Sequence, residues 1–232
     1  MKYTLIAMML GLAGVATAGQ SVVAQAPVQV AATTPAWGVE VAGNYNFGLG
    51  QFLKKGNAFG KKNHVNTIGA DVTGVYNIDE NNAVTLRFGY NYGSDKFAVW
   101  SPVPSVGLSA RERLHSFTLM PGYRYTVALD ERWSVFAGAN VGLAANSVKL
   151  SEHVSIDRVS NMTFDAHKSA WGLAWSVEAG AKYQLDANWY AFGAVSYSGN
   201  TARPSVRFNG YNVGKMKTQQ YLGVRLGVGV QF

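Results

Sequence analysis

The sequence predicts an all-β fold: an eight-stranded antiparallel up-and-down transmembrane β-barrel. Three observations carry this prediction. Apolar residues alternate with small or polar ones along eight segments, as they do in strands that have one apolar face. Tight turns and long loops alternate between these segments. Charged residues within the segments stand only on the face opposite the apolar one.

The last twelve residues, Tyr221 to Phe232, show the alternation most clearly. One face is apolar and ends on the terminal phenylalanine, and the other is small or polar with an arginine in mid-strand. Seven earlier segments repeat this pattern: 37–47, 67–77, 84–92, 116–127, 133–143, 171–184 and 189–198. In 189–198 the choice of face stays open, because Tyr190 and Phe192 fall on one parity and Val195 on the other.

The connections between the segments are alternately short and long. Tight turns are expected at 79–82, 130–132 and 186–188. Long loops are expected at about 48–64, 94–113, 146–168 and 199–218. Short periplasmic turns opposite long extracellular loops are typical of a membrane barrel, in which each strand spans the bilayer with ~9–11 residues. Trp37, Trp133 and Trp189 stand beside the short-turn end and predict an aromatic girdle there.

The inner face of the predicted barrel carries all the charged residues of the strands. These are Glu40, Asp71, Arg87, Arg124, Glu178, Lys182 and Arg225, which we call the lumen charge network. A water-soluble barrel needs the reverse arrangement, with apolar residues inside, because burying so many charges in a small core is very unfavourable. The apolar face is therefore expected to contact lipid.

An eight-stranded barrel encloses only enough space for its own side chains. The lumen charge network should therefore form a hydrogen-bonded plug with small pockets of water. The alternative is a narrow porin-like channel for small solutes or ions, because charged lumens tune selectivity where water passes through.

Two positions do not fit the simple pattern. Pro121 lies inside a strand and cannot donate a ladder hydrogen bond, so a bulge or bend is expected there. Phe136 falls on the inner face, where we expect it to fill lumen volume beside Gly138 and Gly142.

The chain begins with a segment that reads as an export signal. Residues 1–18 contain a lysine, an apolar run and the sequence Ala16-Thr17-Ala18, which is the order of a cleaved secretory signal. Ala26 ends a second candidate cleavage site. Residues 19–35 carry no charge and predict a flexible N-terminal segment, followed by the transmembrane β-barrel in 36–232. The 232-residue chain has no cysteine, and its formal net charge is +7.

The alternating architecture, the inward charges and the final Phe232 resemble the small eight-stranded outer-membrane β-barrels of the OmpA/OmpX type. This resemblance implies a protein of the bacterial outer membrane, in contact with outer-membrane lipid and lipopolysaccharide, and the uninterrupted apolar exterior leads us to expect a monomer. It also implies that Phe232 is an assembly signal, through which the C-terminal strand meets the barrel-assembly machinery. The implied roles are structural ones or surface interaction, such as membrane integrity, adhesion or host-surface contact.

Two of the long loops are basic and contain aromatic residues but no acid. Together they form the basic loop patch: Lys54, Lys55, Lys61, Lys62, Arg203, Arg207, Lys215 and Lys217. In a closed barrel the first and last strands pair, so the two loops are neighbours. Such a patch suits the phosphates of lipopolysaccharide or an anionic polymer, and the alternative is a solvated loop surface without a ligand. Nucleic acid is not expected, because no nucleic-acid-binding module is recognisable.

An enzymatic role, such as modification of lipid A, finds little support in the sequence. His115 and Ser116 are adjacent in a strand, so their side chains point to opposite faces and cannot act as base and nucleophile. His153 and His167 stand near acids in a long loop, where such residues are usually solvated. We therefore expect no catalytic residues, no metal and no cofactor.

Overall fold

The computed structural model describes residues 37–49, 65–99, 106–156, 160–208, 211–215 and 217–232. The predicted signal in 1–18 and the flexible segment in 19–35 lie outside these residues. The described residues form ten strands: β1 (Trp37–Gly48), β2 (Thr67–Asn77), β3 (Asn82–Val99), β4 (Val106–Ala128), β5 (Trp133–Ile156), β6 (Ser160–Gln184), β7 (Trp189–Asn200), β8 (Ser205–Phe208), β9 (Tyr211–Lys215) and β10 (Gln219–Gln231). No helix among them is long and apolar enough to cross a membrane.

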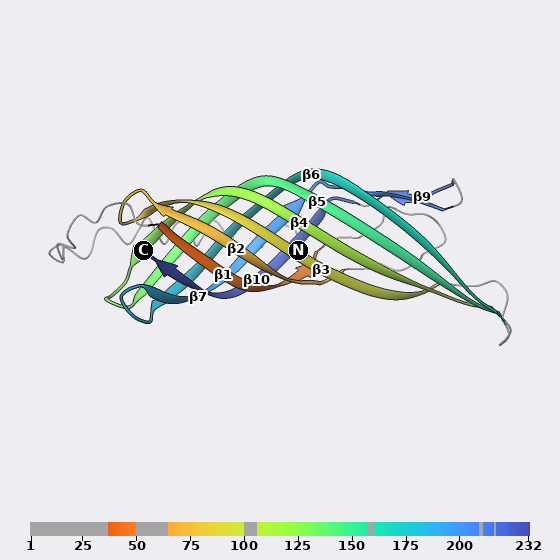
Figure 1. Ribbon diagram of the computed structural model, residues 1–232, viewed down its shortest axis with the longest axis horizontal. Helices are drawn as coiled ribbons and strands as arrows, with labels where there is room; N and C mark the ends of the chain where they lie inside the picture. The colour runs from red at the N-terminus through yellow and green to blue at the C-terminus, as the bar shows by residue number, and fades with distance from the viewer. Residues whose placement is uncertain (1–36, 50–64, 100–105, 157–159, 209–210, 216) are drawn as a thin grey trace. The chain divides into compact units, whose positions relative to one another are not determined.

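Eight of these strands close into one antiparallel barrel in the order β1-β10-β7-β6-β5-β4-β3-β2 (Figure 1). Each strand pairs with its neighbours along the chain, and the seam between β1 and β10 closes the ring. At the end of this seam the N–H groups of Trp37 and Phe232 donate to each other's carbonyl oxygens, at 3.1 and 2.9 Å. The predicted eight-stranded up-and-down barrel is confirmed.

The predicted loops at 94–113 and 146–168 are largely strand. β3 and β4 remain paired as far as Val99 and Leu108, and β5 and β6 as far as Ile156 and Ser160. Figure 1 shows β3 to β6 running on beyond the other barrel strands. Hydrophobic alternation does not report these extensions, because strands that leave the membrane need no apolar face. A further hairpin, β8–β9, lies in the predicted loop at 199–218.

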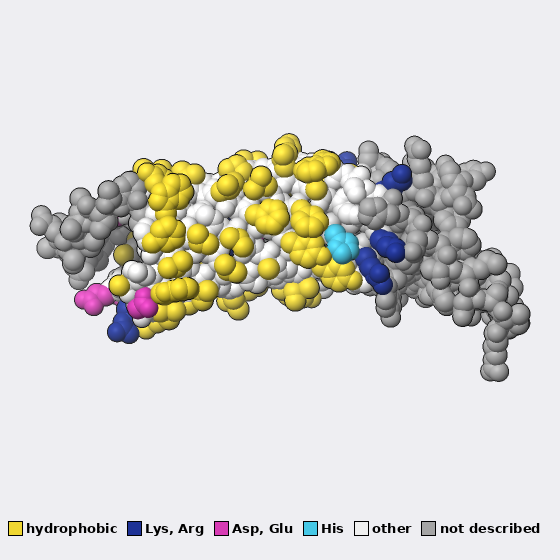
Figure 2. All heavy atoms as spheres, in the orientation of Figure 1, with side chains coloured by type: hydrophobic (Ala, Val, Ile, Leu, Met, Phe, Trp, Pro, Cys, Tyr) yellow, Lys and Arg dark blue, Asp and Glu magenta, His cyan; other side chains and the backbone are white. Residues whose placement is uncertain are grey.

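The outer wall of the barrel is apolar. Every barrel strand contributes large exposed hydrophobic side chains, for example Val41, Ile68, Leu86, Leu119, Val141, Leu173, Val195 and Leu226. Figure 2 shows them as a band around the visible face, with charged side chains at its two ends. A surface of this kind fits a hydrocarbon environment.

The girdle predicted at the short-turn end is present. Trp37, Trp133 and Trp189 are exposed, each as the first residue of its strand. The rings of Trp37 and Trp133 pack against tyrosines on the neighbouring strands, with centroids 4.7 and 4.9 Å apart. Aromatic rings at this height are suited to a membrane–water interface.

The three tight turns share one construction around an aspartate: Asp79, Asp130 and Asp186. In each turn Oδ1 accepts hydrogen bonds from the backbone N–H groups two and three residues later, at 2.7–2.8 Å. The pKa of Asp79 is lowered chiefly by the side-chain amide of Asn82. The backbone N–H groups of Arg132 and Asn188 are the chief cause of the lowered pKa values of the other two aspartates.

Of the bulge or bend expected at Pro121, the bulge is absent. The β3–β4 register continues through the pair of Leu86 and Pro121 without a shift. The β4–β5 register is the same before and after the proline, and only the pairs of Met120 and Pro121 with β5 are missing from the ladder. β4 therefore accommodates the missing N–H of Pro121 by the local loss of pairing with β5, without the extra residue of a bulge.

Candidate functional site

The lumen charge network lies in the middle of the barrel interior. Its seven residues come from β1, β2, β3, β4, β6 and β10. Six of them are buried, and the side chain of Lys182 is 11% exposed. The structure brings all seven together around three carboxylates.

Glu40 and Arg124 form the most deeply buried pair of the network, at 0% and 1% exposure. Arg124 donates from Nη1 to Oε1 of Glu40 at 2.5 Å and from Nη2 to Oε2 at 2.9 Å. The hydroxyl of Tyr190 donates to Oε1 at 2.8 Å, and Nζ of Lys182 lies 3.9 Å from the same oxygen. This two-pronged geometry offsets the loss of hydration that burial imposes on both charges.

Glu178 links this pair to the remaining charges. Its Oε1 accepts from Nη2 of Arg87 at 2.5 Å and lies 3.5 Å from Nη2 of Arg124. Its Oε2 accepts from Nη1 of Arg225 at 2.7 Å. Arg225 also donates from Nε and Nη2 to the carboxylate of Asp71, with Nε 3.0 Å from Oδ2. All seven residues therefore belong to one connected network across the barrel.

An aromatic cluster fills the interior beside the charges. Tyr190 and Phe192 of β7 are buried together with Phe136, so the inner face of β7 carries the aromatic side chains. The guanidinium of Arg124 lies 4.6 Å from the ring centroid of Phe136, and that of Arg225 lies 5.4 Å from the ring of Phe192. These contacts place aromatic faces against cations in a setting away from water.

Inward-facing glycines make room for these rings. A Cβ on Gly180 would meet Cζ of Phe136 at 2.7 Å, and one on Gly227 would meet Cε1 of Phe192 at 2.8 Å. Phe136 does lie inside the barrel, as predicted. The close neighbour of its ring is Gly180, which faces it across the β5–β6 ladder, rather than the glycines of its own strand.

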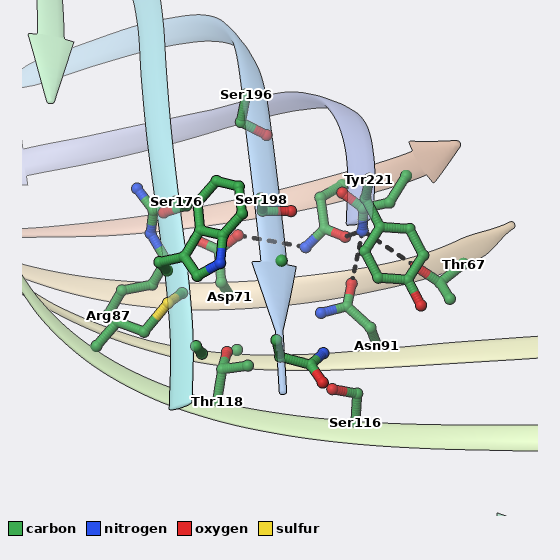
Figure 3. A pocket seen from close by; sticks show the side chains of 18 of the residues that line it. Thr67, Asp71, Arg87, Asn91, Ser116, Thr118, Ser176, Ser196, Ser198 and Tyr221 are labelled. Atoms are coloured by element: carbon green, nitrogen blue, oxygen red, sulfur yellow. Dashed lines mark hydrogen bonds between the residues drawn. The ribbon is translucent and has the colours of Figure 1, made fainter. Parts of the chain in front are cut away.

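A polar cavity of about 80 Å³ lies between the charge network and the long-loop end of the barrel. Its wall consists largely of neutral polar side chains, including Thr67, Asn91, Ser116, Thr118, Ser176 and Ser198 (Figure 3). Asp71, Arg87 and Arg225 also line it. Nε of Arg87 is buried without a hydrogen-bond partner among the described residues, so it can donate to a water molecule. We call this cavity the polar chamber; at ~10–15 Å³ per water, it has room for roughly five to eight waters.

Loop residues fold into the mouth of the barrel above this chamber. We call 201–204 the mouth segment. Thr201 donates its N–H to the carbonyl of Leu173 at 2.8 Å, and its hydroxyl accepts from the N–H of Leu173 at 2.9 Å. Ala202 is fully buried, and its carbonyl accepts from Nδ2 of Asn146 at 3.1 Å. A Cβ on Gly172 would collide with the backbone of the mouth segment, so this glycine provides the space for it.

The sequence prediction included small pockets of water in the lumen but not the position of the polar chamber, and it did not include the mouth segment. A signal for the mouth segment exists in the small inner residues at the loop ends of β5 and β6. Ala144 pairs with Gly172 across the ladder, and Ala174 packs with Ala144 and Ala202. Two small inner residues on β5, Gly142 and Ala144, pair with two on β6, Ala174 and Gly172, and together they leave a hollow in the wall that another segment must fill.

The basic loop patch is only partly within the described residues. Lys54, Lys55, Lys61 and Lys62 lie outside them. Arg207 and Lys215 belong to β8 and β9, but their side chains are not described. Arg203 is exposed and donates to the hydroxyl of Thr218, and Lys217 is half-buried. The pairing of Gly48 with Tyr221 brings the beginning of the first loop beside the end of the last one.

The residues considered for catalysis or metal binding do not assemble in the described part of the chain. Ser116 is buried in the lumen, whereas His115 lies on the outer wall and accepts or donates a 2.9 Å hydrogen bond with the Tyr90 hydroxyl. The side chains of His153 and His167 are outside the description. Among the described residues no group of three or more His, Asp or Glu side chains is arranged to hold a metal ion.

One family model and several known proteins are similar to this chain. The model of the outer membrane protein beta-barrel domain family matches residues 12–232. Protein opa of Haemophilus influenzae is 40% identical over 60 residues, which are 26% of this chain and 40% of that protein's length. Similar solved structures include OprG of Pseudomonas aeruginosa (17% identity, 87% of this chain, 98% of that one, TM-score 0.48). Ail of Yersinia pestis is another (13% identity, 86% and 100%, TM-score 0.44). Because the family model spans residues 12–232, the chain belongs to the outer membrane protein beta-barrel domain family, whose members lie in the bacterial outer membrane.

Proposed function

We propose that this protein is a closed outer-membrane barrel that acts at the cell surface through its loops and does not serve as a pore or an enzyme. The observation that carries the proposal is the continuous lumen charge network. Glu178 contacts Arg87, Arg124 and Arg225, which come from three different strands. Such a network ties opposite walls together and occupies the space through which a solute would pass.

The layers on either side of the network support the same conclusion. The aromatic cluster around Tyr190 and Phe192 occupies one side. The mouth segment, with Ala202 buried in the barrel, occupies the loop end. The polar chamber between the network and the mouth segment has room for water that would satisfy buried polar groups such as Nε of Arg87.

Recordings from planar lipid bilayers test the closed barrel. Purified wild-type protein should give no large, stable, voltage-independent current steps. A variant with Glu178 and its partners Arg87 and Arg225 all replaced by serine is the positive control, because it removes the centre of the network. Regular steps from the wild type, similar to those of the control, would instead support the narrow channel, for which the polar chamber of about 80 Å³ is the favouring feature.

The basic loop patch is the surface that we propose for contact with a partner. Its eight cationic residues suit the phosphates of lipopolysaccharide or a sulfated polymer. Binding to either should weaken steeply between low salt and physiological salt, where the Debye length is ~8 Å. Replacing Lys54, Lys55, Lys61 and Lys62 by glutamine should reduce this binding and leave the folded barrel intact. Equal binding by the wild type and the four-glutamine variant, or binding that is independent of salt, would contradict the proposal and favour a solvated loop surface without a ligand.

We also propose that the protein is exported with a cleaved signal in residues 1–18 and works as a monomer. The mass of the mature protein tests this directly. A mass equal to that of a chain beginning after Ala18, or to that of a chain beginning after Ala26, distinguishes the two candidate cleavage sites. The mass of the uncleaved chain, found in the outer membrane, would contradict the proposal.

A further inference from the structure

Three basic side chains gather on the outer wall of the barrel at the loop-side border of the hydrophobic band. Arg113 of β4 pairs directly with Lys149 of β5, and His115 follows two residues along β4 on the same face. We call Arg113, His115 and Lys149 the wall site. All three are partly exposed. Figure 2 shows a histidine and basic side chains next to one another where the hydrophobic band ends.

Aromatic residues fix the height of the wall site relative to the membrane. The hydroxyl of Tyr90 is 2.9 Å from Nδ1 of His115, and the ring of Tyr92 lies 5.2 Å from the imidazole. The ring of Phe117, directly below on β4, packs against Tyr90 at 4.9 Å. Tyrosine rings of this kind mark the level of lipid headgroups. The three basic groups therefore stand where headgroup phosphates are found.

The donors of the wall site suit an anion. The side chains of Asp95, Glu112 and Glu152, the acids at this end of β3, β4 and β5, lie outside the described side chains. An arginine offers a planar pair of donors to a phosphate, and a lysine ammonium has three donors, so it can bind a phosphate in addition to a protein partner.

The wall site is separate from the basic loop patch. In the barrel order, β4 and β5 lie on the opposite side from β1 and β10, whose ends carry the basic loops. Any anion bound at the wall site is thus held by strands other than those that carry the basic loops. The inference below does not depend on a partner for the loops.

We propose that the wall site binds the phosphate of a lipid in the outer leaflet. The phosphate would lie between Arg113 and Lys149, with His115 as a third donor. The acyl chains would run down the exposed wall of Phe117, Leu119 and Leu143. This apolar surface directly below the cations is the reason to choose a membrane lipid over a soluble anion, because only a lipid uses both surfaces at once.

The test uses the full chain folded in detergent micelles and native mass spectrometry as the readout. The probes are lipid A with its two phosphates, enzymatically dephosphorylated lipid A, and inorganic phosphate. The wild type should retain phosphorylated lipid A, and the double variant Arg113→Gln/Lys149→Gln should bind it at least tenfold more weakly. Dephosphorylated lipid A should bind both proteins equally and weakly.

The matched control variant is Lys168→Gln. Lys168 is exposed on the neighbouring strand β6, but it pairs with Val148, which is buried inside the barrel, so it belongs to the opposite face. This control should bind lipid A like the wild type. An equal loss in both variants would show a diffuse charge effect and overturn the site. Displacement of lipid A by inorganic phosphate at similar concentrations would overturn the assignment to a lipid, and an unchanged double variant would overturn both.

The folded state is checked in the same samples by the difference in gel mobility between heated and unheated protein. The wall site residues are on the surface, so both variants should keep the wild-type difference. Should the double variant fold poorly, the single variant Arg113→Gln supplies the comparison, with an expected loss of about threefold or more in lipid A binding. Wild-type binding by that folded single variant would count against the proposal.

Discussion

Arg124 offers the sharpest test of the lumen charge network. We expect Arg124→Met to destabilise the barrel strongly, because it leaves the fully buried Glu40 without its main partner. Two of the three hydrogen bonds to Glu40 are lost, those at 2.5 and 2.9 Å, and the one from Tyr190 remains. Hydrogen bonds to charged groups contribute ~1.5–3 kcal/mol each.

The expected magnitude follows from these contacts. Breaking a buried ion pair by removing one partner costs ~3–5 kcal/mol, which is of the size that two lost charged hydrogen bonds give. Lys182 lies 3.9 Å from Glu40 and can move closer, which favours the lower end of this range. A loss of ~3 kcal/mol with a urea slope of ~1–3 kcal/mol per molar shifts the unfolding midpoint by roughly 1–3 M.

The assay is urea unfolding of the purified barrel in detergent, followed by gel mobility and tryptophan fluorescence. A double variant, Glu40→Gln/Arg124→Met, also removes the buried charge of Glu40 that Arg124→Met leaves unpaired, so it should recover a large part of the lost stability. Arg132→Met, in an exposed turn, is the surface control and should leave the midpoint unchanged. An unfolding free energy of Arg124→Met within ~1 kcal/mol of the wild-type value would refute the reasoning, because that is the range of an exposed ion pair. A double variant no more stable than Arg124→Met would refute it as well.

Gly172→Leu should expel the mouth segment, whose backbone fills the space at this glycine; bilayer recordings should then show more frequent current events, and wild-type traces would contradict this. The lowered pKa values of Asp79, Asp130 and Asp186 stabilise the fold at neutral pH, and this contribution is lost as the pH falls from about 4 through the folded-state values. In a variant with all three aspartates replaced by asparagine, the free energy of unfolding should fall less steeply with decreasing pH below about pH 4. The same pH dependence in the variant and the wild type would argue against this contribution. Phe232→Ser should lower the assembled yield in cells but not refolding in detergent, and an equal loss in both would mean that the side chain is only structural.

The barrel strands and the position of the charges were predictable because they obey one constraint. Where lipid covers the outer face, the side-chain period of two separates apolar from polar residues, so the inward direction of Glu40 or Arg225 can be read from its neighbours. The extensions of β4 and β5 beyond the membrane obey no such constraint. Their strand structure depends on backbone pairing, which leaves little trace in the pattern of hydrophobicity.

The face of β7 could not be assigned from its own residues, since it is apolar on both sides. The answer is in β10, where the inner positions Gly227 and Gly229 leave space for Phe192 and Tyr190. Likewise, the effect of Pro121 on the ladder depended on which of the two neighbouring strands would otherwise accept a hydrogen bond from a backbone N–H at this position. Both questions concern pairing between strands that are distant in the chain, and they need the register before they can be answered.

The seam between β1 and β10 has a consequence for how such a chain enters a membrane. Its two strands are the barrel strands farthest apart in the chain, and the ring closes only when Trp37 meets Phe232. Until then β1 has an open row of N–H and C=O groups on one side, which hydrocarbon cannot satisfy. A half-inserted barrel is therefore a high-energy state. Insertion must either keep the edge of β1 in water until β10 arrives or provide a temporary strand to cover it.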